Sequence, residues 1–209
     1  FQIESIFIML VRWSQELDIF YLFGLMPTYH HKETGKRFLF IHIPRTGGRF
    51  LQENFKLNGF ESEQKIWKSI DGIEITHLSR ELYKKHLNVK GIPHIAIIRD
   101  PLERYLSLSS YSFHPKDWFR RQVDYLTKDT FLWKFEDGFG NDFSDWIGKI
   151  LDMDFVIREF DKNYIYNEIG QKLTLEYMES NYKKISNTVE ISNYVKSYYS
   201  EDYDLWLTS

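Results

Sequence analysis

A glycine pair that directly follows an apolar run is the first feature of this sequence that could do chemistry. The run Phe38–Ile43 leads into Pro44-Arg45-Thr46-Gly47-Gly48. Glycines let successive backbone N–H groups converge on an anion, and the N-terminus of a following helix adds unsatisfied donors and the positive end of its dipole. The spacing is not the GxxxxGK[ST] pattern of ATP-binding loops, so Mg²⁺ coordination through a loop hydroxyl is not predicted. The segment predicts a phosphate cradle, and a strand–helix turn without a ligand is the alternative.

A second group of candidate ligands follows the apolar run His94–Ile98. Arg99 ends this run, and Ser107 comes 107 − 99 = 8 positions later, about two helical turns along. Between them, Asp100 and Pro101 are residue types that favour the N-cap and the first position of a helix. A guanidinium at the strand end and a hydroxyl on the helix could therefore bind one anionic group. In the alternative, Arg99 pairs with a carboxylate and Ser107 is an ordinary surface hydroxyl.

Composition limits the classes of protein to which this chain can belong. It has 209 residues, 43% of them hydrophobic and 27% charged, and a net charge of −3. These values are typical of a globular domain, and the small negative charge does not favour nucleic acid as a partner. Because the chain has no cysteine, disulfides, cysteine-ligated metal centres and thiol catalysis are excluded. The histidines show no spacing typical of a metal site, so no metal is expected.

The elements that would carry these residues alternate between strand and helix. We expect strands where short apolar runs occur, at 37–43, 73–76, 94–98 and 155–158. We expect helices after the glycine pair and at 79–87, 102–111, 141–151, 161–173 and 188–207. The pattern predicts an α/β fold, a P-loop-like parallel sheet flanked by helices on both faces, with ligands at the carboxyl ends of the strands. We expect a single domain over 1–209, with an irregular helical insertion at 113–140 that borders the cleft.

The first 35 residues are expected to form an N-terminal helical extension. Apolar residues recur at helical spacing between Ile3 and Phe20, which predicts an amphipathic helix packed on the body or on a second copy of the chain. Glu4, Arg12 and Asp18 interrupt the apolar stretch, so no membrane span is predicted. A homodimer through this helix and a cytoplasmic location are the corresponding expectations.

Both motifs, in this order and spacing, resemble those of the sulfotransferases that use 3′-phosphoadenosine-5′-phosphosulfate (PAPS), in particular the heparan sulfate 2-O- and 6-O-sulfotransferases. The family's HIPKTGGTS is similar to HIPRTGGRF at 42–50, and its RDPxxRxxS is similar to RDPLERYLS at 99–107. Further likeness at 155–159 and 198–206 extends the resemblance over about 38–206, which is most of the chain.

The resemblance implies a role for each motif residue. Thr46–Gly48 would hold the 5′-phosphate through backbone amides, and Arg99 and Ser107 would bind the 3′-phosphate. In the 2-O-sulfotransferases a histidine before the RDP strand is the general base, and His77 lies in a similar context, 99 − 77 = 22 residues ahead of Arg99. An imidazole can take the proton of a sugar hydroxyl as that oxygen attacks sulfur. A histidine that only caps a strand end or a helix start is the alternative.

Three positions depart from the family's pattern. Arg45 replaces the loop lysine that faces the transferring group, and Arg49 and Phe50 take the place of two hydroxyl residues beside the cofactor. A guanidinium at Arg45 would still stabilise charge on the leaving phosphate, although it copies a compact ammonium poorly. Arg49 would either add charge at the 5′-phosphate or be solvated. Lys184 lies where relatives fold a loop over the nucleotide and would assist the 3′-phosphate, with a solvated basic turn as its alternative.

The function that the resemblance implies is transfer of a sulfuryl group from PAPS to a hydroxyl, with a saccharide as acceptor and His77 as base. Positioning and charge stabilisation supply most of the rate in such transfers. Two alternatives stay open. One is a module that binds PAPS or its product, adenosine 3′,5′-bisphosphate (PAP), without turnover, and the other is a small-molecule kinase. Preference among PAP, ADP and ATP discriminates between them.

Overall fold

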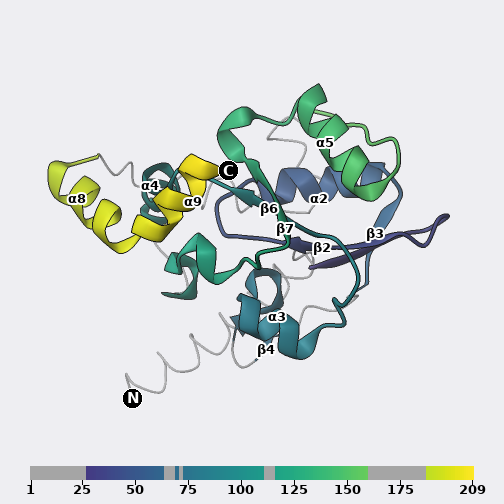
Figure 1. Cartoon of the computed structure of the whole chain (residues 1–209), viewed down its shortest axis with the longest axis horizontal. Helices are drawn as coiled ribbons and strands as arrows, with labels where there is room; N and C mark the ends of the chain where they lie inside the picture. Colours follow the sequence, from purple (N-terminus) through teal and green to yellow (C-terminus); the bar gives the residue numbers. More distant parts are fainter. Residues whose placement is uncertain (1–26, 64–68, 71–72, 111–115, 160–186) are drawn as a thin grey trace, which may run out of the picture.

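The computed structural model describes residues 27–63, 69–70, 73–110, 116–159 and 187–209. Its centre is a five-stranded mixed sheet with the strand order β3-β1-β2-β6-β7 (Figure 1). The strands are β1 (Thr28–His31), β2 (Arg37–Ile41), β3 (Phe60–Ser62), β6 (His94–Ile98) and β7 (Thr130–Lys134). A separate two-stranded sheet joins β4 (Ser69–Ile70) to β5 (Ile73–Glu74).

The parallel half of the sheet carries both motifs. Strands β2 and β6 are parallel, with Ile41 opposite Ala96, and β6 and β7 are parallel, with Ile98 opposite Lys134. Nearly all side chains of β2 and β6 are buried, as expected for strands that are covered on both faces. The carboxyl ends of parallel neighbours lie at one edge of a sheet, so the segments that follow β2 and β6 are brought together there.

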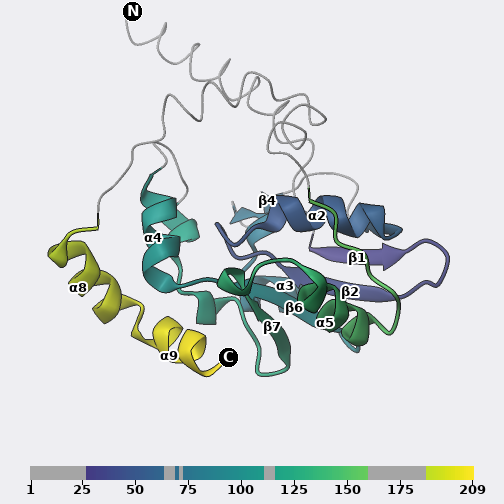
Figure 2. The ribbon, with the colours of Figure 1, turned by 90° about the horizontal axis from the view of Figure 1, so that it is seen from above.

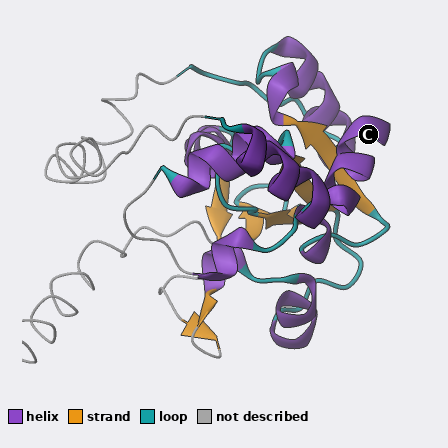
Figure 3. Ribbon diagram, turned by 90° about the vertical axis from the view of Figure 1, so that its left-hand side faces the viewer, coloured by secondary structure: helices purple, strands orange, loops and turns teal. Residues whose placement is uncertain are grey.

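Helices cover both faces of this sheet (Figure 3). The α-helices are α2 (Gly48–Leu57), α3 (Arg80–His86), α4 (Pro101–Ser109), α5 (Asn141–Leu151), α8 (Val189–Tyr198) and α9 (Ser200–Thr208). Short 3-10 helices are η1 (Ile75–His77), η2 (Lys116–Phe119), η3 (Gln122–Asp124) and η4 (Phe135–Asp137). In Figure 1, α2 and α5 lie above the sheet and α3 lies below it. The expected α/β class, with helices on both faces, is therefore confirmed.

Alternation along the strands divides the core into two layers. On one face, Phe38 and Phe40 of β2 pack with Phe55 of α2 and Phe143 of α5. On the other face, the intervening residues of β2 and β6 pack with Tyr83 of α3 and with Leu78, Tyr125 and Leu126. The aromatic face has rings in direct contact, such as Phe38 and Phe55 with centroids 4.9 Å apart. Bulky aromatic packing thus fixes the strand that precedes the glycine pair.

The sheet is mixed, and the expectation of an all-parallel sheet was wrong. Strand β1 runs antiparallel to both β2 and β3. Residues 28–31 were expected in a helical extension but form this strand, because a tight connection returns the chain onto β2. Gly35 at φ 67° occupies the left-handed region there, and its N–H donates to the carbonyl of His31 at 2.9 Å. The expected amphipathic helix between Ile3 and Phe20 and the expected helix at 161–173 lie outside the described residues.

The segment 113–140 was expected to be a helical insertion, and its described part, 116–140, contains the edge strand β7 between 3-10 turns. Strand β7 is only half-buried along its length, so its sequence lacks the continuous apolar run of a central strand. The expected strand at 73–76 pairs only over Ile73–Glu74, with β4, outside the main sheet. The expected final helix is divided at Tyr199, whose ring is buried and whose hydroxyl donates to the Phe119 carbonyl at 2.7 Å.

Residues 155–158 were expected to be a strand, and they are extended but are not a strand of the sheet. Side-chain amides of α2 occupy the place of a strand partner. Asn58 accepts from the Val156 N–H and donates to the Val156 carbonyl, both at 2.7 Å. Asn54 pairs in the same way with the main chain of Arg158, at 2.8 and 3.3 Å. The main-chain groups are thereby satisfied without a β-ladder.

Candidate anion-binding site

The loop after β2 has the backbone conformation that its glycines predict. Gly47 has φ 87° and Arg45 has φ 71°, a value that is uncommon for a residue with a side chain. Thr46 is fully buried, and its hydroxyl donates to the Ile43 carbonyl at 2.8 Å. At Gly48 a Cβ atom would lie 2.1 Å from Nε2 of His42, so only glycine fits between the first turn of α2 and this ring. The loop is thus tightly fixed against its own strand.

Arg45, Arg99 and Ser107, from the two motifs, are in direct contact at the carboxyl edge of the sheet. The Nε atom of Arg45 donates to the Ser107 hydroxyl at 2.9 Å, across 62 residues of sequence. An Nη1 atom of Arg99 donates to the carbonyl of Arg45 at 3.2 Å. Two guanidinium groups and one hydroxyl therefore lie together at the ends of adjacent parallel strands, a set of donors that suits an anion. The hydroxyl of Ser107 is bonded by Arg45 and not by Arg99, with which the sequence paired it.

Arg99 is poised for a negatively charged partner. Its Nε atom is buried and has no hydrogen-bond partner among the described residues. Burial lowers the pKa of Arg99, and the positive charge of Arg45 lowers it further, while the carboxylate of Glu103 opposes the shift. That carboxylate belongs to an exposed residue and lies 3.8 Å from Nη2. The Phe135 ring lies under the guanidinium, 4.6 Å from centroid to Cζ. An anion between the two arginines would relieve both their desolvation and their repulsion.

Aromatic rings close the side of the site that faces α5. A Cβ atom on Gly47 would lie 3.2 Å from the Phe135 ring and 3.4 Å from the Phe139 ring. Phe50 contacts Phe139, with centroids 5.2 Å apart, and so belongs to this aromatic layer. Arg49 is exposed on the first turn of α2. Of the two substituted positions after the glycine pair, Arg49 can therefore reach a bound anion from solvent, and Phe50 packs on protein.

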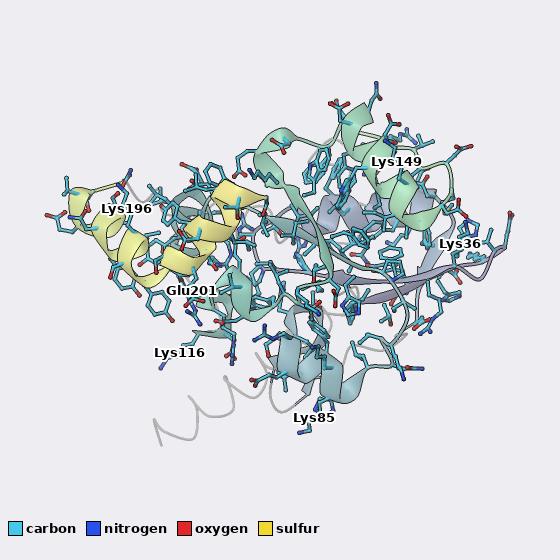
Figure 4. The ribbon with its side chains drawn as sticks, viewed as in Figure 1. Lys36, Lys85, Lys116, Lys149, Lys196 and Glu201 are labelled. Atoms are coloured by element: carbon cyan, nitrogen blue, oxygen red, sulfur yellow. The ribbon has the colours of Figure 1, made fainter. Side chains whose placement is uncertain are left out.

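Five lysines are labelled in Figure 4, and another, Lys134, ends β7 opposite Ile98 at this edge of the sheet. The labelled lysines, Lys36, Lys85, Lys116, Lys149 and Lys196, project outward from separate elements. Lys184, the lysine that the sequence placed at the site, lies outside the described residues. Lys134 places its Nζ atom over the Trp206 ring, whereas Arg45 and Arg99 present planar donor groups suited to phosphate at the loop.

His77, the expected base, contacts the His42 ring, which in turn lies against Gly48. Its Nδ1 atom is 3.0 Å from the carbonyl oxygen of His42, and the two imidazole centroids are 4.5 Å apart. A carbonyl only accepts, so Nδ1 carries the proton and Nε2 of the neutral ring keeps a lone pair. The His77 side chain is 7% exposed, with the Trp118 ring edge-on at 5.0 Å. The geometry supplies a correctly polarised imidazole in a sheltered position.

His42 is held neutral in this environment. Burial lowers the pKa of His42 well below its usual value, and the charges of His77, Arg49 and Arg45 lower it further. Its Nδ1 atom is buried without a hydrogen-bond partner among the described residues. The imidazole therefore acts as a packing group against Gly48, and its main-chain carbonyl orients His77.

Arg104 ties the loop to the segment that carries Trp118. Its side chain is 1% exposed and donates to three carbonyls: Pro44 at 3.1 Å, Arg120 at 3.1 Å and Trp118 at 2.7 Å. A buried guanidinium that is fully hydrogen-bonded to main chain fixes those segments relative to each other. Arg104, the second arginine of RDPLERYLS, thus has a structural role.

Sequence analysis missed several residues that shape the site. Gln122 bonds the main chain of Arg99, Glu136 accepts from the Asp100 N–H, and Phe135 lies under the Arg99 guanidinium. All three lie in the segment that was expected to be an irregular insertion. No local pattern marks them, because each acts on a residue more than twenty positions away. The one available signal was the aromatic content of 131–139.

Two shallow surface hollows lie away from this edge. One is lined by η3 and α8 residues, including Arg121 and Tyr198, and the other lies at the opposite end of β6, near His94. Within the described ranges, no group of three metal-ligating side chains could hold an ion. None of the described helices is both long and apolar enough to cross a membrane.

Comparisons with family models, with curated proteins and with solved structures each found no match to this chain.

Proposed function

We propose that this chain binds PAPS at the edge formed by the loop 43–48 and the segment 99–107, and transfers its sulfuryl group to a hydroxyl of a saccharide. The observation that carries the proposal is the contact of Arg45 with Ser107 and of Arg99 with the Arg45 carbonyl. These contacts bring together the two motifs to which we assign the phosphates of the ligand. The ligand that matches two separate anion-binding motifs is a nucleotide with phosphate on both its 3′ and 5′ positions.

The 3′-phosphate is assigned to Arg99 and Ser107. The Arg99 side chain is 19% exposed, so its guanidinium can offer charge-assisted bonds to an anion at this edge. The 5′-phosphosulfate is assigned to the backbone amides of Thr46–Gly48 and the N-terminus of α2, with Arg49 at its solvent side. The positive end of the helix favours an anion there.

Transfer follows an in-line displacement. The acceptor hydroxyl oxygen forms a bond to sulfur as the bond from sulfur to the 5′-phosphate oxygen breaks, and the hydroxyl proton passes to Nε2 of His77. The electron pair of the broken bond remains on the 5′-phosphate of PAP, where Arg45 and the loop amides balance the added charge. The hydrogen bond from His77 Nδ1 to the His42 carbonyl supports this assignment, because it leaves Nε2 as the acceptor.

One observation favours a second candidate, a PAP-binding module without turnover. The Arg45 guanidinium bonds Ser107, so it is turned toward the 3′-phosphate side. In the sulfotransferases that the sequence resembles, the corresponding lysine faces the group that is transferred. An arginine that stays on Ser107 would strengthen nucleotide binding and leave the sulfuryl group without a cationic partner.

Calorimetric titration with PAP, AMP, ADP and ATP tests the binding. We expect PAP to bind well above AMP and ADP, and Arg99→Ala to remove that preference at a cost of about 1.5–3 kcal/mol. Arg37→Ala is the matched control, because Arg37 pairs with Glu63 at the start of β2, away from the loop. Equal affinity of the unmodified protein for PAP and AMP would refute the assignment, and preference for ATP would favour a kinase.

A radiolabelled PAPS assay with a panel of saccharides then separates enzyme from module. Label transfer to any hydroxyl acceptor establishes the enzyme. Tight PAP binding without transfer across the panel establishes the module.

A further inference from the structure

The main chain of Arg99 is held by a buried glutamine that is itself held by helix α9. The Arg99 N–H donates to Oε1 of Gln122 at 2.9 Å, and Nε2 of Gln122 donates to the Arg99 carbonyl at 2.8 Å. The N–H groups of Gln122 and Val123 donate to the two carboxylate oxygens of Asp202, at 2.8 and 3.0 Å. Gln122 and Asp202 are both 0% exposed. One hydrogen-bonded route therefore runs from α9 to the strand end.

A second route reaches the next residue from the same helix. The Asp100 N–H donates to Oε1 of Glu136 at 2.9 Å, and the indole of Trp206 donates to Oε2 of Glu136 at 3.1 Å. Asp202 and Trp206 are four positions apart and so lie on one face of α9. Figure 2 shows α9 beside β7 and near the start of α4. Residues 99–100 link β6 to α4.

Side-chain hydrogen bonds take the place of the β-ladder at residues 99 and 100, just beyond the end of β6. The ladder between β6 and β7 stops at the pair Ile98 and Lys134. Beyond it, the side-chain amide of Gln122 makes both main-chain bonds that a strand partner would make to Arg99. The direction of the Arg99 guanidinium depends on this backbone, because the side chain leaves from it with few alternative rotamers once Phe135 lies underneath.

We propose that Gln122 and Glu136 are positioning residues, through which helix α9 sets the main chain of Arg99 and Asp100 and so aims the Arg99 guanidinium at the 3′-phosphate. The inference rests on the proposed function for the identity of the ligand. It adds that selectivity for a 3′-phosphate depends on the docking of a helix that contributes no ligand of its own. The two routes are independent, so each can be removed separately.

The test compares Trp206→Phe with Trp133→Phe. Each substitution removes one indole donor and keeps an aromatic ring, but the Trp133 donor bonds the Gly138 carbonyl and takes no part in either route. Gln122→Leu removes the other route with a side chain of similar volume. Two quantities are measured in each folded variant: amide hydrogen exchange of residues 99 and 100 without nucleotide, and the ratio of PAP affinity to AMP affinity.

We expect Trp206→Phe to speed exchange of the Asp100 amide and Gln122→Leu to speed exchange of the Arg99 amide. Each should lower the affinity ratio about 2- to 10-fold, with AMP affinity nearly unchanged. A general loss of folded protein would lower both affinities equally and leave the ratio constant. Parental exchange and a parental ratio in Trp206→Phe overturn the inference, and so does an equal fall of the ratio in Trp133→Phe.

The two proposals fail in different ways. An unmodified protein that binds PAP no better than AMP contradicts the assigned ligand, and the exchange rates then decide the positioning role alone. An unmodified protein with a clear PAP preference that survives in Trp206→Phe supports the ligand and contradicts the positioning role.

Discussion

Arg45 is the residue that distinguishes the proposed enzyme from the proposed binding module. Its Nε atom bonds Ser107, and its backbone is in the left-handed region, so the side chain is directed toward α4. If the group moves to the bridging oxygen during transfer, Arg45→Ala should lower turnover at saturating PAPS by about 100- to 1,000-fold, as loss of one preorganised charge commonly does. Arg45→Lys should retain or raise activity, because a lysine restores the point charge at this place. Steady-state rates and PAP affinities of the variants provide the measurement.

Two results would contradict a catalytic role of Arg45 in the natural protein. If Arg45→Ala weakens PAP binding as much as Arg99→Ala does and leaves the rate of transfer unchanged, Arg45 belongs to the 3′-phosphate site alone. If only Arg45→Lys transfers sulfate, the natural protein is the binding module.

His77 provides a second test at a single residue. Because its Nδ1 atom is committed to the His42 carbonyl, Nε2 is the only ring atom that can take a proton from the acceptor. We expect His77→Ala to slow transfer about 10²- to 10⁴-fold and to leave PAP affinity nearly intact, since the ring contacts no phosphate. His86→Ala, at the exposed end of α3, is the control. Transfer at the parental rate by His77→Ala would show that the ring is structural.

At the scale of the elements, the contact to test joins Gly48, in the first turn of α2, to His42, the residue after β2. A Cβ atom at Gly48 would overlap Nε2 of His42 at 2.1 Å, so Gly48→Ala forces the ring or the first turn of α2 to move. We expect a loss of about 1–3 kcal/mol in the free energy of unfolding, the usual effect of overpacking. Gly140→Ala is the control, because a Cβ there meets no atom within 4 Å. Chemical denaturation of both variants measures the difference.

A double-mutant cycle identifies the cause of that loss. His42→Ala removes the ring, so Gly48→Ala should cost much less in that background. An equal cost in both backgrounds would mean that the glycine is required for backbone conformation and not for space.

The elements that were predicted correctly are those with local signals. The apolar run before the glycine pair predicted β2 and α2, and Asp100-Pro101 predicted α4, where Asp100 caps the helix by accepting from the Glu103 N–H at 2.9 Å. The elements that were missed depend on distant partners. Strand β7 is half-buried and lacks an apolar run, and β1 acquires its conformation by pairing with β2 and β3. Residues 155–158 read as a strand, but asparagines of α2 satisfy their main chain.

At the scale of the whole molecule, the residues of the candidate site also fall into those that local sequence signals predicted and those that depend on distant partners. The placement of Arg99 at a strand end and of Ser107 on the helix that follows it was predicted, because both are local features. Gln122, Glu136 and the α9 residues that hold them were not, because those contacts span 23 to 80 residues. The candidate charged and hydroxyl groups at this edge can therefore be predicted from the sequence, whereas the side chains that hold their main chain are found only in the structure.

The burial of Asp202 gives the molecule a pH dependence of unusual sign. Loss of solvation raises the pKa of Asp202 above its usual 3.8, although the N–H groups of Gln122 and Val123 and the charge of Arg104 oppose the rise. The folded state thus holds this proton more tightly than the unfolded state does. Its contribution to stability is fully present below pH 3.8 and is lost as the pH rises through the folded pKa.

We therefore expect the difference in unfolding free energy between the parent and Asp202→Asn to fall as the pH rises from below 3.8 toward neutrality. Glu63→Gln is the control of opposite sign. The hydrogen bond from Arg37 lowers the pKa of Glu63 below 4.5, so that carboxylate stabilises the fold above this pH and its contribution is lost on acidification. Urea unfolding of the three proteins across the acid range supplies the measurement. A parent–Asn difference that increases with pH would show that the two N–H groups and Arg104 outweigh desolvation, and that α9 is anchored by a charged carboxylate.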